Sequence, residues 1–437
     1  MLSSLTAHLC VLLLVLVAVV SNAVQASTAP LSATLTPEIL NFTQKLDHSA
    51  KDSQETFQQS YQIVTDYFRE GGPILFVQSA ESPLVLLQYN VFIDWAEELG
   101  AIVATLEHRF FGTSYPEDFH FANPGPDDYA QLTLDNAIKD GVHFVNWIRE
   151  TVPGAQDSKV IYNGGSYGGF LAAEAIIREP DAFYGSIASS PLLYSFGGQT
   201  LEGNPHHYAG LDMVSNIWFD ESAEAAYKIQ EATSLFSRCV AEQNCSDALP
   251  DLPLCSEANA TQWTQLYGKV TSSYYSISQF NYAFVNVWPW AYPLQTAINL
   301  TLAASSPGEV LAVPLRGVSW AQDGCIDPNN RNLTGQPTFF GDSFQWIRCT
   351  YFPGSFGDSR PGSLLPSSNT TVGGDCWSPY AVPWQAPDFN ETNEYFVEKL
   401  NLTLETLDQT ERLLIVQVDY YARSSPYRGF DVICDYT

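Results

Sequence analysis

A serine flanked by glycines is the residue of this sequence best placed to do chemistry. Ser166 stands in the middle of Gly164-Gly165-Ser166-Tyr167-Gly168, which fits the pattern G-x-S-x-G. On such a turn a serine hydroxyl can attack a carbonyl carbon and form an acyl-enzyme. We therefore expect Ser166 to be a nucleophile. The alternative is that these glycines form a tight turn and nothing more.

The oxyanion that forms during such an attack needs hydrogen-bond donors. The backbone N–H that follows the nucleophile is one expected donor, and here it belongs to Tyr167. A second donor comes from the loop after an earlier strand, which is "VQSAESP" in this sequence. The N–H groups near Ser79 and Ala80 are the candidates. The alternative is an ordinary loop, because this segment lacks the glycines that let a backbone approach a substrate.

The serine also needs a histidine to accept its proton and a carboxylate to orient that histidine. In folds with this turn the chain order is Ser, Asp, His. None of the histidines follows residue 207; they are His8, His48, His108, His120, His143, His206 and His207. The expected late histidine is therefore not present. We predict a structural role for His108, with a place at the edge of the site as the alternative. The adjacent pair His206-His207 is a weak metal candidate, so we predict neither a metal nor another cofactor.

Strand-like and helix-like runs alternate around the serine. Apolar, β-rich runs predict strands over 71–80, 101–112, 158–166, 183–193 and 412–418, and apolar residues at helical spacing predict helices over 132–150 and 167–180. Strands that are apolar on both faces and alternate with helices indicate a parallel sheet covered by helices. The predicted fold class is therefore α/β.

The character of the chain changes after about residue 197. The segment 197–387 contains six cysteines, five Asn-x-Ser/Thr sequences and long helix-like runs. We interpret it as an inserted, largely helical cap domain. The hydrolase domain would then consist of a first part at 27–196 and a second part at 388–437.

Several features predict that the protein is exported. Residues 1–26 read as a signal peptide, with a membrane anchor as the alternative. Cysteines beyond this leader are expected to form disulfides. The predicted glycosylation sites are Asn41, Asn244, Asn259, Asn299, Asn332, Asn369, Asn390 and Asn401.

The net charge excludes some partners. Asp and Glu number 48 against 19 Lys and Arg, which gives a formal charge of -29. Such a surface repels nucleic acids and anionic membranes, so neither is a predicted partner. An acidic surface suits an acidic medium, where protonation of carboxylates reduces the repulsion between them. The alternative is that the charge serves solubility alone.

Taken together, several segments resemble the serine carboxypeptidases of the lysosomal prolyl carboxypeptidase and dipeptidyl peptidase II group, especially their secreted, acid-acting fungal members. The resemblance extends from about residue 42 to 418, and its pieces are "GGPILF", "LEHRFFGTSYP", "QLTLDNAIKD", "YNGGSYGGFLAAEAIIREP", "FYGSIASSPL" and "FQWIRCTYF". It implies an α/β-hydrolase domain with an inserted helical, disulfide-linked cap, and cleavage of peptides after proline at acid pH.

The resemblance also assigns roles to individual residues. Ser166 matches the nucleophile and Tyr167 the oxyanion donor of the family. The family's aspartate falls on Tyr421, and the only acid nearby, Asp419, comes two residues earlier. The chain departs from the family pattern from residue 418 on. Either the C-terminus is truncated or mis-spliced, or this is a real protein without a working triad.

The aromatic segment "FQWIRCTYF" offers a candidate substrate pocket. Trp346, Tyr351 and Phe352 could form a flat apolar slot for a proline ring, although aromatic residues at this density also suit a core. The predicted function is a secreted, or vacuolar or lysosomal, serine peptidase that acts on peptides or proteins through Ser166. Without a late histidine this chain is expected to be weakly active or inactive. The alternatives are a non-catalytic binding homologue and a lipase or esterase. The sequence leaves the oligomeric state open.

Overall fold

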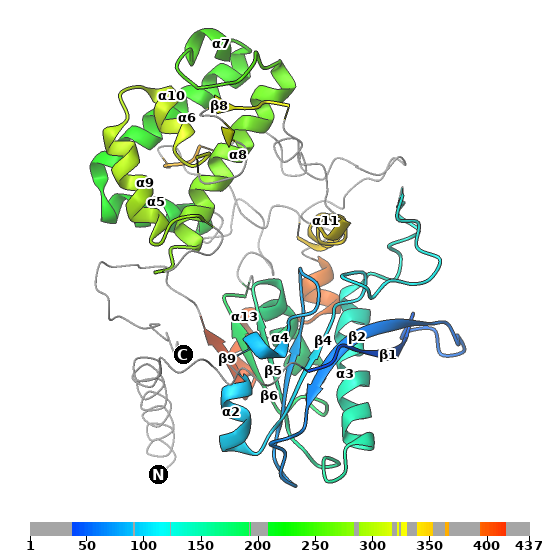
Figure 1. Cartoon of the computed structure of the whole chain (residues 1–437). Helices are drawn as coiled ribbons and strands as arrows, with labels where there is room; N and C mark the ends of the chain where they lie inside the picture. Colours follow the sequence, from blue (N-terminus) through cyan, green and yellow to red (C-terminus); the bar gives the residue numbers. More distant parts are fainter. Residues whose placement is uncertain are drawn as a thin grey trace.

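The computed structural model describes the chain in several segments: residues 37–90, 92–122, 124–191, 193, 209–283, 288–316, 321–322, 325–329, 339–352, 363–366 and 394–416. Figure 1 shows a sheet with flanking helices and, above it, a separate group of helices. Several predicted features lie outside the described residues: the leader at 1–26, His206, His207 and Asp419.

A seven-stranded mixed sheet forms the centre of the lower body. Its spatial order is β1-β2-β4-β3-β5-β6-β9. The strands are β1 (Leu40–Lys45), β2 (Thr56–Val64), β3 (Ile74–Gln78), β4 (Ile102–Leu106), β5 (Val160–Gly165), β6 (Gly185–Ser189) and β9 (Leu413–Val416). The run from β4 through β3, β5 and β6 to β9 is parallel, as the sequence predicts.

The two strands at the other edge differ from the prediction. β1 pairs antiparallel with β2, and β2 pairs antiparallel with β4, so the sheet is not wholly parallel. β1 alternates between exposed and buried positions along most of its length, which is typical of a strand covered on one face. Because β1 contains several polar residues, it has no continuous apolar run by which the sequence could predict it.

The parallel strands bury both faces of the sheet. All residues of β3 are buried, and they alternate between two clusters: Ile74 and Phe76 face the larger core, and Leu75 and Val77 face the smaller one. Helices α3 (Leu134–Thr151) and α4 (Tyr167–Arg178) cover the first face, and α2 (Phe92–Leu99) packs on the second. This is the arrangement expected when strands are apolar on both sides.

The bounds of helices α3 and α4 follow from local chemistry. Thr133 caps α3, because its side chain accepts a hydrogen bond from the Asn136 N–H at 3.1 Å. α4 stops at Arg178, and Glu179 then precedes Pro180, a position that disfavours helix. Shorter helices of this body are η1 (Leu87–Tyr89), η3 (Tyr395–Lys399) and α13 (Leu404–Gln409).

The upper body in Figure 1 has its own hydrophobic core. It contains α5 (Ala209–Glu221), α6 (Ala223–Glu242), α7 (Cys245–Ala248), α8 (Ala260–Gln279), α9 (Pro293–Ala303), α10 (Pro307–Ala312), β7 (Ala321–Gln322) and β8 (Cys325–Ile326). Trp218, Phe236 and Tyr274 are buried at its centre. The boundaries of the cap domain, at residues 197 and 387, stay a prediction.

Helix α11 (Phe339–Tyr351) falls within the predicted cap range but packs on the sheet body. Trp346, Ile347 and Phe352 belong to the larger core around the sheet. Phe344 packs against Tyr167 at 6.2 Å between ring centroids. The chain therefore returns to the end of the sheet that carries Ser166 before its last strand.

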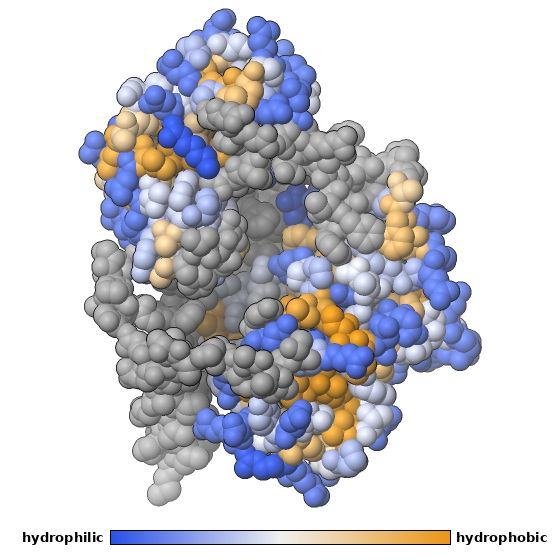
Figure 2. Space-filling view, in the orientation of Figure 1, coloured by the Kyte–Doolittle hydropathy of each residue, from blue (hydrophilic) through white to orange (hydrophobic). Residues whose placement is uncertain are grey.

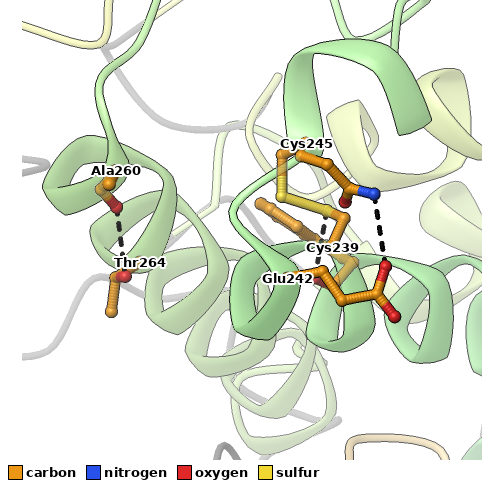
Figure 3. The surroundings of a disulfide bond; sticks show 7 residues. Cys239, Glu242, Cys245, Ala260 and Thr264 are labelled. Carbon is orange, nitrogen blue, oxygen red and sulfur yellow. Dashed lines mark hydrogen bonds between the residues drawn. A yellow bond between two sulfur atoms is a disulfide. The ribbon is translucent and has the colours of Figure 1, made fainter.

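Disulfides connect parts of the upper body. Cys239 pairs with Cys245 where α6 turns into α7, and Cys255 pairs with Cys325 across a separation of 70 residues. Figure 3 shows the first of these bonds. Nearby, the Asn244 side-chain amide donates a hydrogen bond to the Glu242 carboxylate at 3.2 Å. Cys349 is also disulfide-bonded.

The described surface is largely hydrophilic, and predicted glycosylation sites lie on it. The five predicted glycosylation sites among the described residues are all exposed: Asn41, Asn244, Asn259, Asn299 and Asn401. In Figure 2 hydrophilic residues cover most of the described surface, and hydrophobic residues gather over part of the sheet body. Within the described residues, no helix has the length and apolar character to cross a membrane.

Candidate active site

Ser166 lies on a sharp turn between strand β5 and helix α4. Its backbone has φ 56° and ψ -125°, a conformation that non-glycine residues rarely adopt, and its side chain is exposed. Two hydrogen bonds fix the turn. The Ser166 N–H donates to the Ser189 carbonyl at 2.9 Å, and the Phe170 N–H donates to the Ser166 carbonyl at 3.0 Å. The order strand, strained serine, helix is that of a nucleophile elbow, and with the parallel strands it confirms the predicted α/β-hydrolase fold.

Close backbone contacts explain the glycines around the serine. A Cβ on Gly164 would lie 2.0 Å from the Gly168 carbonyl oxygen, and one on Gly169 would lie 2.7 Å from the Ser189 carbonyl oxygen. The first backbone contact leaves no room for a side chain. These glycines let helix α4 start directly against the ends of β5 and β6, and this exposes the Ser166 hydroxyl.

Glu81 lies in the loop that follows β3. Burial raises the pKa of its carboxyl, and the Ser166 side chain and the backbone of Glu81 and Tyr167 lower it in part. The Tyr167 N–H as an oxyanion donor stays a prediction. Sequence reasoning did not single out Glu81.

The predicted role of Ser79 is wrong. Its N–H donates to the Leu106 carbonyl at 2.8 Å and so continues the β3–β4 ladder. Its hydroxyl instead accepts a hydrogen bond from the Val85 N–H at 2.8 Å. Ala80 is buried, and its Cβ lies 3.1 Å from where a Cβ on Gly168 would be. The Ala80 N–H as an oxyanion donor stays a prediction.

Glu107 fixes the loop that carries Glu81. One of its carboxylate oxygens accepts a hydrogen bond from the Leu84 N–H at 2.7 Å. The other oxygen accepts from the Thr113 N–H at 2.9 Å and the Ser114 hydroxyl at 2.7 Å. Glu107 is buried, so these donors replace the water that its charge would otherwise need.

His108 supports the elbow from behind. It is fully buried, and burial lowers its pKa to about 4, so the ring is neutral at most pH values. Nδ1 lies 2.7 Å from the Arg109 carbonyl oxygen, which makes this nitrogen the donor. Nε2 then accepts from the Tyr167 hydroxyl at 3.1 Å. These contacts give His108 a positioning role.

Arg109 and Asp140 form a buried ion pair beneath the strands. Arg109 Nη2 lies 2.6 Å from Asp140 Oδ1, and Nε lies 2.7 Å from Oδ2. His48 Nε2 adds a contact of 2.8 Å to Oδ1. Burial alone would raise the pKa of Asp140, but the Arg109 charge and these hydrogen bonds hold it below the usual range. The guanidinium also donates to the carbonyls of Lys45, Leu46 and Gln131, so it ties together the ends of several segments.

The structure corrects two residues of the predicted substrate pocket. Trp346 is buried and stacks on Tyr129 with 5.2 Å between ring centroids. Phe352 is buried against Tyr167 and Phe170. Both side chains belong to the core, because the aromatic face of α11 packs inward on α4. Tyr351 is partly buried, and its place in a pocket stays a prediction.

In the described part of the chain, each histidine hydrogen-bonds a residue other than Ser166. His48 contacts Asp140, and His108 contacts Tyr167. His120 contacts Asp128, and His143 contacts Gln44. The general base is therefore not assigned to any of them, and Asp419 as the triad acid stays a prediction. No group of three metal-binding side chains occurs within the described segments.

Comparisons with known proteins agree with this geometry. Residues 44–325 match the model of the family described as serine carboxypeptidase S28. The chain is similar to lysosomal Pro-X carboxypeptidase of Mus musculus, with 28% identity over 272 residues, covering 58% of this chain and 53% of that protein. Its similarity to the Homo sapiens protein of the same name is 35% over 162 residues, covering 36% of this chain and 32% of that protein. The chain thus spans about half the length, or less, of these curated relatives.

Proposed function

Because the chain belongs to the serine carboxypeptidase S28 family, we propose that it is a serine-type peptidase that hydrolyses peptides through an acyl-enzyme at Ser166. The exposed Ser166 on a strained elbow, where strand β5 runs directly into helix α4, is the observation that carries this proposal. Backbone strain at an exposed nucleophile is common in active sites, where the surrounding fold holds it in place.

The proposed reaction proceeds in two steps. The Ser166 oxygen attacks the peptide carbonyl carbon, its proton passes to a general base, and the amine leaves with that proton. Water then attacks the acyl-enzyme and releases the new carboxylate. In both steps the proposed donor, the Tyr167 N–H, stabilises the tetrahedral oxyanion. The general base remains to be identified by experiment.

An active-site probe tests the nucleophile directly. We expect a fluorophosphonate to label the purified protein at Ser166 and to fail with Ser166→Ala. Ser272→Ala is the matched control, because Ser272 is exposed on α8 in the other body and should not affect labelling. Labelling that survives in Ser166→Ala, or is absent from the parent, would overturn the proposal and favour a non-catalytic binding protein.

Proline-directed cleavage is a finer part of the proposal. It rests on the relatives, which are named Pro-X carboxypeptidases. We expect an N-acylated Pro-Phe dipeptide to be hydrolysed faster than the matched Ala-Phe dipeptide. Equal rates would remove the proline preference. Cleavage of p-nitrophenyl esters but of neither peptide would favour a lipase or esterase.

The setting of the enzyme is proposed on similar grounds. The relatives are named lysosomal, and the chain carries many acidic residues and exposed glycosylation sequences. We propose a secreted or lysosome-like location with peptides or proteins as substrates. Expression in a secretory host, followed by removal of N-glycans and measurement of the change in mass, tests whether these sites are used.

A further inference from the structure

A pocket opens on the upper body beside the disulfide between Cys239 and Cys245. It has a volume of about 250 Å³ and lies between the end of α6, the short helix α7 and the start of α8. Figure 3 shows the disulfide and, across from it, Ala260 in the first turn of α8. Pockets for drug-sized ligands measure roughly 300–1,000 Å³, so this one suits a smaller group, such as a single sugar residue. The proposed reaction does not use it.

Two predicted glycosylation sites stand at the rim of this pocket. Asn244 is one of its lining residues, and so are Ala258 and Ala260, the neighbours of Asn259 on either side. Asn244 and Asn259 are both exposed. An N-glycan begins at the side-chain nitrogen of its asparagine, so the first N-acetylglucosamine at either site would start next to the pocket.

We infer that the pocket binds the first N-acetylglucosamine of a glycan on Asn259. This inference rests on the secretory setting proposed above. The Asn259 Oδ1 accepts a hydrogen bond from the Gln262 N–H at 3.0 Å, and the Asn259 N–H donates to Gln262 Oε1 at 2.8 Å. This capping box uses the oxygen of the Asn259 amide, and the nitrogen that carries the sugar is not part of it. At Asn244, by contrast, the amide nitrogen donates to Glu242 at 3.2 Å.

The lining of the pocket matches the two kinds of surface on this sugar. Val240 and Trp263 supply an apolar wall, against which the ring face and the acetyl methyl group can pack. Gln243, Ser246 and Asp247 supply polar side chains for the sugar hydroxyls and the amide N–H. A neutral ligand with an apolar face and several donors fits this lining better than an anion does, because Asp247 would repel an anion.

Both walls of the pocket are fixed before a sugar binds. On one side the disulfide joins the end of α6 to α7, and Gln243 ends α6 in the left-handed conformation with φ 55°. On the other side Gln262 donates to the Asn329 side chain at 2.9 Å, which holds the start of α8. Trp263 packs edge-on against Phe236, with 5.9 Å between ring centroids. A preformed site lowers the entropy cost of docking, and the covalent link raises the local concentration of the sugar.

The N-acetyl methyl groups of the glycans test the contact directly. Protein from a secretory host would be trimmed to one N-acetylglucosamine at each site, and its methyl signals recorded by NMR. We expect one signal to lie upfield of the others, because the Trp263 ring shields it, and to vanish in Thr261→Ala, which destroys the Asn259 acceptor sequence. Thr261→Ser retains that sequence and is the matched control, so its spectrum should equal that of the parent. The absence of a shifted signal overturns the inference. A shifted signal that persists in Thr261→Ala also overturns it and places the Asn244 sugar in the pocket instead.

Enzymatic release of the glycans gives a second measurement. From the native protein we expect peptide N-glycosidase to remove the Asn259 glycan about ten-fold more slowly than the glycan on Asn299, an exposed site on α9, which corresponds to a docking free energy of about 1.4 kcal/mol. After unfolding the two rates should be equal. Equal rates in the native protein, or no glycan on Asn259, overturn the inference. Fluorophosphonate labelling of Ser166 in the same preparations tests the proposed function separately, because Thr261→Ala should leave it unchanged.

Discussion

Glu174 offers a quantitative test of how the sheet body is built. It lies in α4, is fully buried, and neither carboxylate oxygen has a hydrogen-bond partner within the described part of the chain. The nearby Arg178 is bonded to Asp135 instead. Burial therefore raises the pKa of Glu174 from 4.5 to about 8, only partly offset by the Arg178 charge. The folded protein holds a proton that the unfolded chain releases at neutral pH.

The sign and size of the effect follow from that difference. The pKa of Glu174 is higher in the folded protein than in the unfolded chain. Its contribution to the free energy of unfolding is therefore complete below about pH 4.5 and is lost as the pH rises to about 8. A pKa difference of about 3.5, at roughly 1.36 kcal/mol for each pKa unit, amounts to about 5 kcal/mol by alkaline pH. Glu174→Gln cannot ionise. It should remove most of this pH dependence while keeping the shape of the side chain.

Urea unfolding at pH 5, 7 and 9 measures the effect. The free energy of unfolding of the parent should fall between pH 5 and pH 9 by several kcal/mol more than that of Glu174→Gln. Glu150→Gln, an exposed change on α3, is the matched control and should keep the pH dependence of the parent. If parent and Glu174→Gln lose stability in parallel, Glu174 is ionised in the folded state and the reasoning from its burial fails.

Three further substitutions test the elbow and its support. Gly164→Ala should abolish probe labelling and lower the yield of folded protein, because the added methyl would lie 2.0 Å from a backbone oxygen; normal labelling would contradict this contact. Asp140→Asn should lower the free energy of unfolding by about 3–5 kcal/mol in a urea titration, since it leaves the buried Arg109 charge without its partner. A loss under 1 kcal/mol would show that the pair is dispensable. His108→Phe should slow labelling of Ser166 about ten-fold with a smaller loss of stability, because the Tyr167 hydroxyl loses its acceptor. An unchanged rate would make His108 merely structural.

Much of the fold could be predicted because its signals are local. Continuous apolar runs identify the parallel strands, and a glycine-rich junction between strand and helix identifies Ser166. Strands β1 and β2 escaped this reading because polar residues alternate along β1 and occur throughout both strands. Their antiparallel pairing depends on contacts that no single segment encodes.

The details of the site could not be predicted for a related reason. Whether an N–H is free depends on the neighbouring strand, and Ser79 donates to Leu106 of β4. Whether an aromatic ring lines a pocket or lies in the core depends on the segments that pack beside it. Trp346 lies in the core, where it stacks on Tyr129.

The tripeptide Glu107-His108-Arg109 shows how tightly the scaffold and the site are coupled. These consecutive buried residues hydrogen-bond three different parts of the structure. Glu107 binds the loop that contains Glu81, His108 binds the Tyr167 side chain, and Arg109 binds the Asp140 carboxylate. Removing or inserting one residue here would misdirect all three at once.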